Sequence, residues 1–258
     1  MDKAQETVIK EVKQLIKQAK RVCILTGAGV SAESGISTFR EAQDGKGLWS
    51  QYDPKQLASL DGFLKDPEKV WQWYQWRREV NQDKKPNPAH IAISQWQKQA
   101  KASGKQQVTL VTQNVDGLHQ QAGSDPDLYE VSGSLVELHG NIWQNHCLQC
   151  GEKHSDDVTG TQQVPKCKPC GGQVRPSVVW FGEALDEKKW QAAETAAYCC
   201  DLFLSIGTSS QVYPAAGLMM LAKSQGAKIV EINPEPTQST VVDYQIKGKA
   251  GKVLPLVF

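Results

Sequence analysis

Four cysteines arranged as two CxxC pairs constrain the fold of this chain more than any other feature of its 258 residues. Cys147 and Cys150 form the first pair, Cys167 and Cys170 form the second, and residues 151–166 separate them. Each pair holds two sulfurs on one tight turn, a spacing typical of a zinc ribbon with four thiolate ligands. Two disulfides or a redox-active CxxC are the alternatives, but a redox pair occurs singly. We predict one Zn²⁺ ion with a structural role, because four thiolates leave no open position for a substrate.

Two stretches of the chain are expected to form a small domain. Residues 141–175 contain the four cysteines and too few large apolar residues to fold alone, so we expect a zinc-ribbon module that folds around its metal. Residues 45–100 are rich in tryptophan and charge and include a helical segment from Pro67 to Arg77, which predicts a helical module.

The rest of the chain predicts an α/β fold, with a Rossmann-like parallel sheet and helices on both faces. Continuous apolar runs alternate with helical stretches, and they occupy residues 21–26, 108–112, 202–206 and 228–232. Polar or glycine residues follow each run. Because ligands bind at the carboxyl ends of such strands, these residues are expected to meet in one crevice. The domain is assigned three segments, 1–44, 101–140 and 176–258.

Composition argues against several classes of protein. Lysine and arginine number 29 against 28 acidic residues, so the chain lacks the basic excess expected of direct nucleic-acid binding. It has no apolar run of the roughly 18 residues that span a bilayer, and its charged N-terminus is unlike a signal peptide. Cys23, Cys199 and Cys200 are assigned to the core, because their apolar surroundings do not suggest a disulfide framework. We expect a cytoplasmic monomer without a membrane segment.

A glycine-rich segment follows the first apolar run. Gly27, Gly29 and Ala32 fit the pattern G-x-G-x-x-A, which joins a strand to a helix in dinucleotide-binding proteins. Glycine lets the backbone approach a pyrophosphate, and the helix N-terminus offers it free amides. On this segment alone, an ordinary glycine turn is an equal alternative.

The segment continues as GAGVSAESGISTFR at residues 27–40, which resembles the cofactor loop of the sirtuins, a family of NAD-dependent protein-lysine deacylases. The paired CxxC and five further motifs follow in the order of that family: TQNVDGLH at 112–119, LHGN at 138–141, VVWFGE at 178–183, GTSSQVYPA at 207–215 and INPE at 232–235. The resemblance therefore covers nearly the whole chain. It implies an enzyme that uses NAD as a cosubstrate, deacylates lysine, and releases nicotinamide and O-acyl-ADP-ribose.

The resemblance also implies roles for individual residues. The NAD site would comprise Gly27, Ala28, Gly29, Ala32, Glu33, Phe39, Arg40, Gln113, Asn114, Asp116, Gly207, Thr208, Ser209, Asn233, Pro234, Glu235 and Ala250. His139 would be the catalytic base, since an imidazole titrates near neutral pH, and Asn114 and Asp116 would act at the nicotinamide and its ribose. His119 is expected to be structural or to support the site from behind it, with assistance to the cofactor as the alternative.

A second part of the likeness concerns the acyl group. Tyr74 and Arg77 match the YxxR pair of sirtuins that remove succinyl and malonyl groups. Three-residue spacing on a helix puts both side chains on one face, where a phenol and a guanidinium can bind a carboxylate. An amphipathic helix with a solvated arginine is the alternative. Acetyl-lysine is expected to remain a substrate, because a small neutral group still fits.

The implied partners are proteins that bear acyl-lysine. They would bind as an extended peptide that adds a strand between residues 178–183 and the segment around Tyr213. The residues expected to contact this peptide are Val179, Phe181, Gly182, Glu183 and Tyr213. Two other functions stay open: a sirtuin that is mainly a deacetylase or mono-ADP-ribosyltransferase, and a silent NAD-binding or zinc-scaffold protein. The polar residues Asn114, Asp116 and His139 argue against a silent protein.

Overall fold

The larger domain of the protein is built around a six-stranded parallel sheet in the order β3-β2-β1-β7-β8-β9. The structure, a computed structural model, describes residues 3–37, 57–126, 135–154 and 160–258. The strands are β1 Arg21–Thr26, β2 Gln107–Thr112, β3 Leu135–Glu137, β7 Leu202–Ile206, β8 Lys228–Asn233 and β9 Tyr244–Lys247. The register places Val22 opposite both Val108 and Leu202. The parallel sheet predicted from the apolar runs is thus confirmed.

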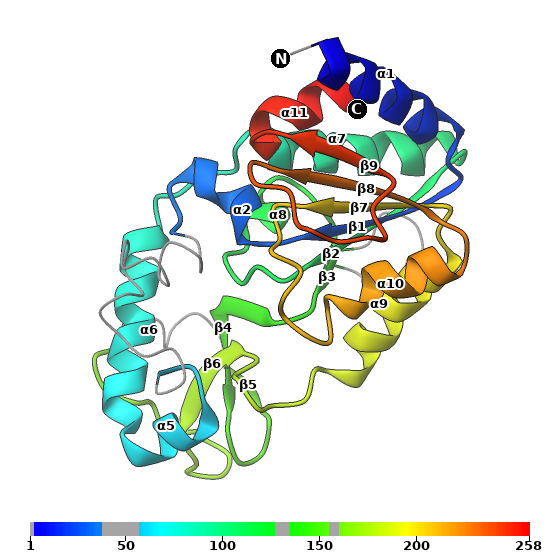
Figure 1. The fold of residues 1–258 in the computed structure, drawn as a ribbon. Coiled ribbons are helices and arrows are strands. Elements are labelled where there is room, and N and C mark those ends of the chain that lie inside the picture. Colours follow the sequence, from blue (N-terminus) through cyan, green and yellow to red (C-terminus); the bar gives the residue numbers. More distant parts are fainter. Residues whose placement is uncertain (1–2, 38–56, 127–134, 155–159) are drawn as a thin grey trace.

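Helices cover both faces of this sheet (Figure 1). One face packs against α1 Lys3–Gln18, α7 Pro88–Ser103 and α11 Ala250–Val257, and the other against α9 Glu187–Cys199 and α10 Gly217–Ser224. In β1, Val22 and Ile24 join the first core, whereas Cys23 and Leu25 join the second. Burial on both faces explains why the strand is apolar throughout. None of the described helices has the length and apolar character that a membrane crossing requires.

Helix α7 packs on the sheet, which corrects the predicted boundary of the helical module. Its buried residues Ile93 and Trp96 lie in the same core as β1 and β2. The helix begins at Pro88, and the side chain of Asn87 caps its first turn. Composition suggested one module over residues 45–100, but tryptophan content does not indicate which neighbour a helix packs against. The boundary therefore falls before α7.

The small domain combines two helices with a second sheet. The helices are α5 Leu60–Lys65 and α6 Pro67–Asn81, and the antiparallel strands, in the order β5-β4-β6, are β4 Gly140–Cys147, β5 Lys153–His154 and β6 Val174–Val178. Phe63, Trp71 and Tyr74 of the helices pack into one core with Cys147 and Val174 of the strands. The helical module and the zinc-ribbon module therefore share one hydrophobic core.

Two of the three cysteines outside the CxxC pairs lie where the sequence predicts. Cys23 and Cys200 are buried, but Cys199 is exposed. Cys199 is the last residue of α9, where the chain leaves the helix on its way to β7. The helix end turns this side chain to solvent, and an apolar neighbourhood in the sequence does not reveal that.

The strand order reverses between β1 and β7. From β1 the chain adds β2 and β3 toward one edge of the sheet, and from β7 it adds β8 and β9 toward the other edge. The loops after these two strands touch: the Gly29 N–H donates to the Gly207 carbonyl at 2.8 Å. A Cβ atom on Gly29 would lie 2.8 Å from the Gly207 oxygen, and one on Gly207 would lie 2.6 Å from the Val30 nitrogen. Short helices then begin at this edge of the sheet, α2 Ala28–Ser31 and η1 Ala32–Ser34 after β1 and α8 Leu118–Gln121 after β2.

We predict that Gly207→Ala destabilises the fold more than Gly226→Ala. Both glycines have positive φ, 61° and 88°, so alanine strains the backbone by about 1–2 kcal/mol at each. Only at Gly207 would the new Cβ meet backbone atoms, since no described atom lies within 4 Å of one at Gly226. Such overpacking costs a further ~1–3 kcal/mol. Chemical denaturation measures both free energies of unfolding, and equal losses would contradict the packing argument.

Candidate functional site

A cleft of about 1490 Å³ lies between the sheet domain and the small domain. The loops after β1, β2, β7 and β8 line one side of it, and α6 and the segment after β6 line the other. In Figure 1 the carboxyl ends of these strands face α6 and the second sheet. The crevice predicted at the carboxyl ends of the strands is therefore present.

Most of the predicted cofactor residues line this cleft. They are Gly27, Ala28, Gly29, Ala32, Glu33, Gln113, Asn114, Asp116, Gly207, Thr208, Ser209, Asn233, Pro234 and Glu235. Ala250 is instead buried in the first turn of α11, and its neighbour Lys249 reaches the cleft. Phe39 and Arg40 lie outside the described residues.

Asn114 and Asp116 are held by Ser31, a residue that the sequence did not single out. Ser31 Oγ donates to Asp116 Oδ2 at 2.7 Å and accepts from Asn114 Nδ2 at 3.1 Å. Asp116 Oδ1 also accepts from the Leu118 N–H at 2.9 Å. Burial raises the pKa of Asp116, and the hydrogen bonds from Leu118 and Ser31 and the charge of Arg77 oppose that rise. Ser31 occupies an unspecified position of G-x-G-x-x-A, so the pattern carries no signal for it.

Two buried histidines lie behind this cluster. His119 Nε2 is 3.1 Å from Thr26 Oγ1, and its ring centroid is 4.7 Å from that of His90. Burial lowers the pKa of His90 to about 4. Burial, and then the charge of His90, lower the pKa of His119 well below 6.5. Both rings are uncharged near neutral pH, and neither lines the cleft, which fits the structural role expected for His119.

Hydrogen bonds fix four separate segments around one end of the cleft. Gln113 Nε2 donates to Thr208 Oγ1 at 3.1 Å, and Asn233 Nδ2 donates to the Thr208 carbonyl at 2.9 Å. Glu33 Oε2 accepts from the Gly251 N–H at 2.7 Å, which ties the glycine loop to α11. The loops after β1, β2, β7 and β8 therefore present their side chains from a fixed backbone.

His139 lies between β3 and β4, half buried in the cleft wall. Its Nδ1 is 3.1 Å from the carbonyl oxygen of Gln113. A carbonyl only accepts hydrogen bonds, so Nδ1 carries the proton and Nε2 keeps a lone pair. Burial lowers the pKa of His139, and the hydrogen bond to Gln113 opposes this in part. The imidazole is therefore neutral near neutral pH and able to accept a proton, as a general base must.

The segment after β6 connects His139 to the small domain. Residues 179–183 form an irregular segment, not a continuation of the strand. The Val179 N–H donates to the His139 carbonyl at 2.9 Å. The Phe181 N–H donates to the carbonyl of Ala58, just before α5, at 2.8 Å. The predicted peptide contacts all line the cleft: Val179, Phe181, Gly182, Glu183 and Tyr213. Phe181 is 49% exposed and Tyr213 71%, so aromatic surface is available at this rim.

Tyr74 and Arg77 both line the cleft from α6, as their spacing predicts. Tyr74 has no exposed surface, whereas Arg77 is half buried. The Arg77 guanidinium lies 4.8 Å from the ring centroid of Trp73 and 5.4 Å from that of Tyr74. Burial lowers the pKa of Arg77, and attraction to Tyr74 and Asp116 opposes this. The cation thus occupies a partly dry site, which favours the approach of an anion.

The four predicted metal ligands form a compact cluster. The sulfurs of Cys147, Cys150, Cys167 and Cys170 lie within 4.8 Å of one another, and all four cysteines are free of disulfides. The Sγ atoms of Cys147 and Cys170 are 3.4 Å apart, and those of Cys150 and Cys167 are 3.6 Å apart. Tetrahedral ligands ~2.3 Å from zinc have sulfurs about 3.8 Å apart. The cluster therefore fits one structural zinc ion, and none of its ligands lines the cleft.

Comparisons with known proteins place the chain among sequences and structures of one family. The model of the Sir2 family matches residues 27–214. The chain is 44% identical over 245 residues to NAD-dependent protein deacylase 2 of Pyrobaculum aerophilum, which covers 95% of this chain and 92% of that relative. It is 45% identical over 232 residues to the NAD-dependent protein deacylase of Thermus thermophilus, with coverages of 90% and 86%.

Solved structures agree with these matches. A Sir2 homologue in complex with NAD has a TM-score of 0.82 and 40% identity, over 100% of this chain and 93% of that one. Sir2Af2 bound to a myristoylated histone peptide has a TM-score of 0.73 and 34% identity, over 98% and 95% of the two chains.

We expect Cys170→Ser to lower the zinc content and the midpoint of thermal unfolding, and Cys199→Ser to change neither. Both cysteines are exposed, but only Cys170 belongs to the cluster. Metal binding is coupled to folding in such modules, so the loss of one thiolate should lower the midpoint by about 5 °C or more. Elemental analysis and calorimetry check this. Full zinc occupancy in Cys170→Ser would contradict the ligand assignment.

The His139 imidazole should titrate below pH 6.5, because burial destabilises its charged form. An unfolded chain takes up this proton near pH 6.5, before the folded protein does. The contribution of His139 to stability is therefore lost as the pH falls below 6.5. An NMR titration of the imidazole measures the midpoint. A midpoint at or above 6.5 would show that the ring is not held in a desolvating site.

Proposed function

Because the chain belongs to the Sir2 family, we propose that it is an NAD-dependent protein-lysine deacylase that removes succinyl, malonyl and acetyl groups. The family membership expected from the ordered motifs is confirmed by the match over residues 27–214 and by the relatives covered almost end to end. The preference among acyl groups rests on one observation, the half-buried Arg77 guanidinium in the wall of the cleft. No family name specifies that preference.

The residues at the carboxyl ends of the strands fit NAD. The glycine loop brings backbone amides and a helix start to one end of the cleft, and Asn114 and Asp116 present an amide and a carboxylate next to it. Bound NAD supplies a ribose joined to a cationic nicotinamide leaving group. We assign Gln113, Asn114 and Asp116 to the nicotinamide and its ribose, since an anionic carboxylate favours a cationic ring. Thr208 and Asn233 would hold the adenosine half.

His139 is assigned the role of general base. Its Nδ1 proton is directed at the Gln113 carbonyl, so Nε2 is left to take a proton from a ribose hydroxyl. With NAD bound, the acyl-lysine carbonyl oxygen would displace nicotinamide from the ribose. The deprotonated hydroxyl would then add to the acyl carbon, and hydrolysis by water would release free lysine and O-acyl-ADP-ribose. The hydrogen bond between the His139 carbonyl and the Val179 N–H places the base beside the segment assigned to the acyl-lysine peptide.

The acyl preference follows from the charge at Arg77. Its guanidinium is partly desolvated, and a carboxylate on the acyl chain could accept two parallel, charge-assisted hydrogen bonds from it. Tyr74 lies behind it and can add a donor. Sir2Af2 binds a myristoylated peptide, so acyl chains of very different chemistry fit this fold. The side chains of α6, not the family alone, therefore support a preference for acidic acyl groups.

The peptide would bind as an extended strand between residues 178–183 and the segment around Tyr213. The exposed rings of Phe181 and Tyr213 at the rim of the cleft support this assignment. A mainly deacetylating or ADP-ribosylating enzyme is the second candidate. A deacetylase would differ in the role of Arg77, and an ADP-ribosyltransferase would differ in the product formed from NAD. Cytoplasmic localisation, the monomeric state and the lack of direct nucleic-acid binding stay predictions from the sequence.

We expect the enzyme to prefer succinyl- and malonyl-lysine to acetyl-lysine in one peptide sequence, and Arg77→Met to remove that preference. Loss of charge-assisted hydrogen bonds should reduce the succinyl-to-acetyl ratio of kcat/KM about 10- to 100-fold. Arg21→Met is the matched control, because Arg21 is exposed at the start of β1. Mass spectrometry of the peptide and of O-acyl-ADP-ribose measures the ratio.

Two outcomes would contradict the proposal. A succinyl-to-acetyl ratio that Arg77→Met leaves unchanged would remove Arg77 from acyl recognition. Consumption of NAD without O-acyl-ADP-ribose, with ADP-ribose attached to protein instead, would favour the second candidate function.

A further inference from the structure

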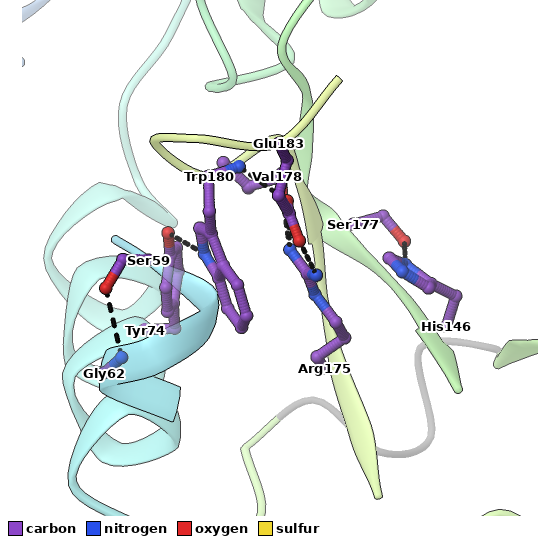
Figure 2. Close-up of polar contacts among 9 residues, drawn as sticks. All are labelled: Ser59, Gly62, Tyr74, His146, Arg175, Ser177, Val178, Trp180 and Glu183. Carbon is purple, nitrogen blue, oxygen red and sulfur yellow. Dashed lines mark hydrogen bonds and ion pairs between the residues drawn. The ribbon is translucent and has the colours of Figure 1, made fainter. Parts of the chain in front are cut away.

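Trp180 connects the two sides of the substrate end of the cleft. Figure 2 shows it between Tyr74 of α6 and Arg175 of β6. Its indole Nε1–H donates to the Tyr74 hydroxyl oxygen at 2.9 Å, and its side chain is only 2% exposed. One side chain from the segment assigned to the peptide is thus bonded directly to a side chain assigned to the acyl group.

Arg175 and Glu183 hold Trp180 in place. The Arg175 guanidinium lies 3.3 Å from the ring centroid of Trp180, forms an ion pair with Glu183 and donates to the Val178 carbonyl at 2.8 Å (Figure 2). Glu183 Oε2 in turn accepts a hydrogen bond from the backbone N–H of Trp180 at 2.8 Å. Burial alone would raise the pKa of Glu183, but the hydrogen bonds from Arg175 and Trp180 and the charge of Arg175 lower it overall. The carboxylate therefore stays ionised and the ring stays fixed at neutral pH.

The bond between Trp180 and Tyr74 sets the direction of the phenol as a donor. A tyrosine hydroxyl has one proton to donate, and an indole N–H can only donate. With the indole as donor, the Tyr74 oxygen is the acceptor, as it is toward Arg77, and the hydroxyl keeps its own proton for a different partner. Burial raises the pKa of Tyr74, more than the charge of Arg77 and the bond to Trp180 lower it, so this proton is present at neutral pH.

We propose that Trp180 is a positioning residue for acyl selection, whose indole N–H occupies the Tyr74 oxygen and thereby commits the phenol proton to a carboxylate on the acyl group. The inference rests on the proposed preference for acidic acyl groups. An acetyl group has no carboxylate to receive this proton, so the effect of Trp180 is selective. If Trp180 served only to fill the core, its replacement would affect all acyl groups alike.

A double-mutant cycle tests the inference with the full-length enzyme. Trp180→Phe keeps an aromatic ring but removes the N–H, and Tyr74→Phe removes the hydroxyl. Trp180→Phe should lower the succinyl-to-acetyl ratio of kcat/KM about two- to tenfold, the range of one neutral hydrogen bond. In the Tyr74→Phe background it should lower the ratio no further, since its target is gone. Equal effects in both backgrounds, or an unchanged ratio, would overturn the inference.

A second measurement does not require Trp180 to be replaced. With tryptophans labelled with ¹⁵N, one of the eight indole N–H resonances should show faster hydrogen exchange in Tyr74→Phe than in the wild type. Unchanged exchange at all eight would overturn the inference. The proposed acyl preference and the role of Trp180 fail in different ways. A wild-type enzyme that does not prefer succinyl-lysine would contradict the acyl preference itself. Additive effects in the cycle, in an enzyme whose succinyl preference still depends on Arg77, would contradict only the role of Trp180.

Discussion

The site depends on the point between β1 and β7 where the strand order reverses. The loops after these two strands leave the sheet side by side and must part around a ligand or touch each other. Here they touch through backbone alone, because Gly27, Gly29 and Gly207 have no Cβ atoms. That contact sets the position of the glycine loop, and Ser31 then fixes Asn114 and Asp116 to it. The polar end of the cleft is thus built outward from a contact between glycines.

The zinc cluster supports the opposite wall, although it lies away from the cleft. Cys147 and Cys167 are buried in the same core as Trp71, Tyr74 and Trp180. A metal that closes the zinc-ribbon module would therefore also fix the strands on which α6 packs, and α6 carries the side chains assigned to the acyl group. This shared core explains how a metal with a closed coordination shell can support substrate recognition without contacting a substrate.

Continuous apolar runs and short motifs predicted the sheet, the zinc ligands and most residues of the cleft, since each of these features is local in the sequence. Contacts between distant segments were not predictable in that way. Helix α7 was assigned to the helical module, but it packs on the parallel sheet, because tryptophan and charge content does not indicate which surface a helix contacts. Ser31, Arg175 and Trp180 were missed as functional residues for the same reason: their roles come from partners 8 to 106 positions away. Ala250 was placed in the cofactor site by likeness alone, and packing of α11 buries it.

The segment from Val178 to Glu183 contacts both the residue assigned to catalysis and a residue assigned to acyl selection. At its start, the Val179 N–H donates a hydrogen bond to the backbone carbonyl of His139, whose side chain is the assigned base. In the middle, the Trp180 indole N–H donates a hydrogen bond to the Tyr74 hydroxyl. At its end, the Glu183 carboxylate accepts a hydrogen bond from Arg175. Both the base and the phenol are therefore positioned by the segment assigned to the peptide. A displacement of this segment would move the base and the acyl-binding groups together, so binding of the peptide backbone and recognition of the acyl group are expected to be coupled.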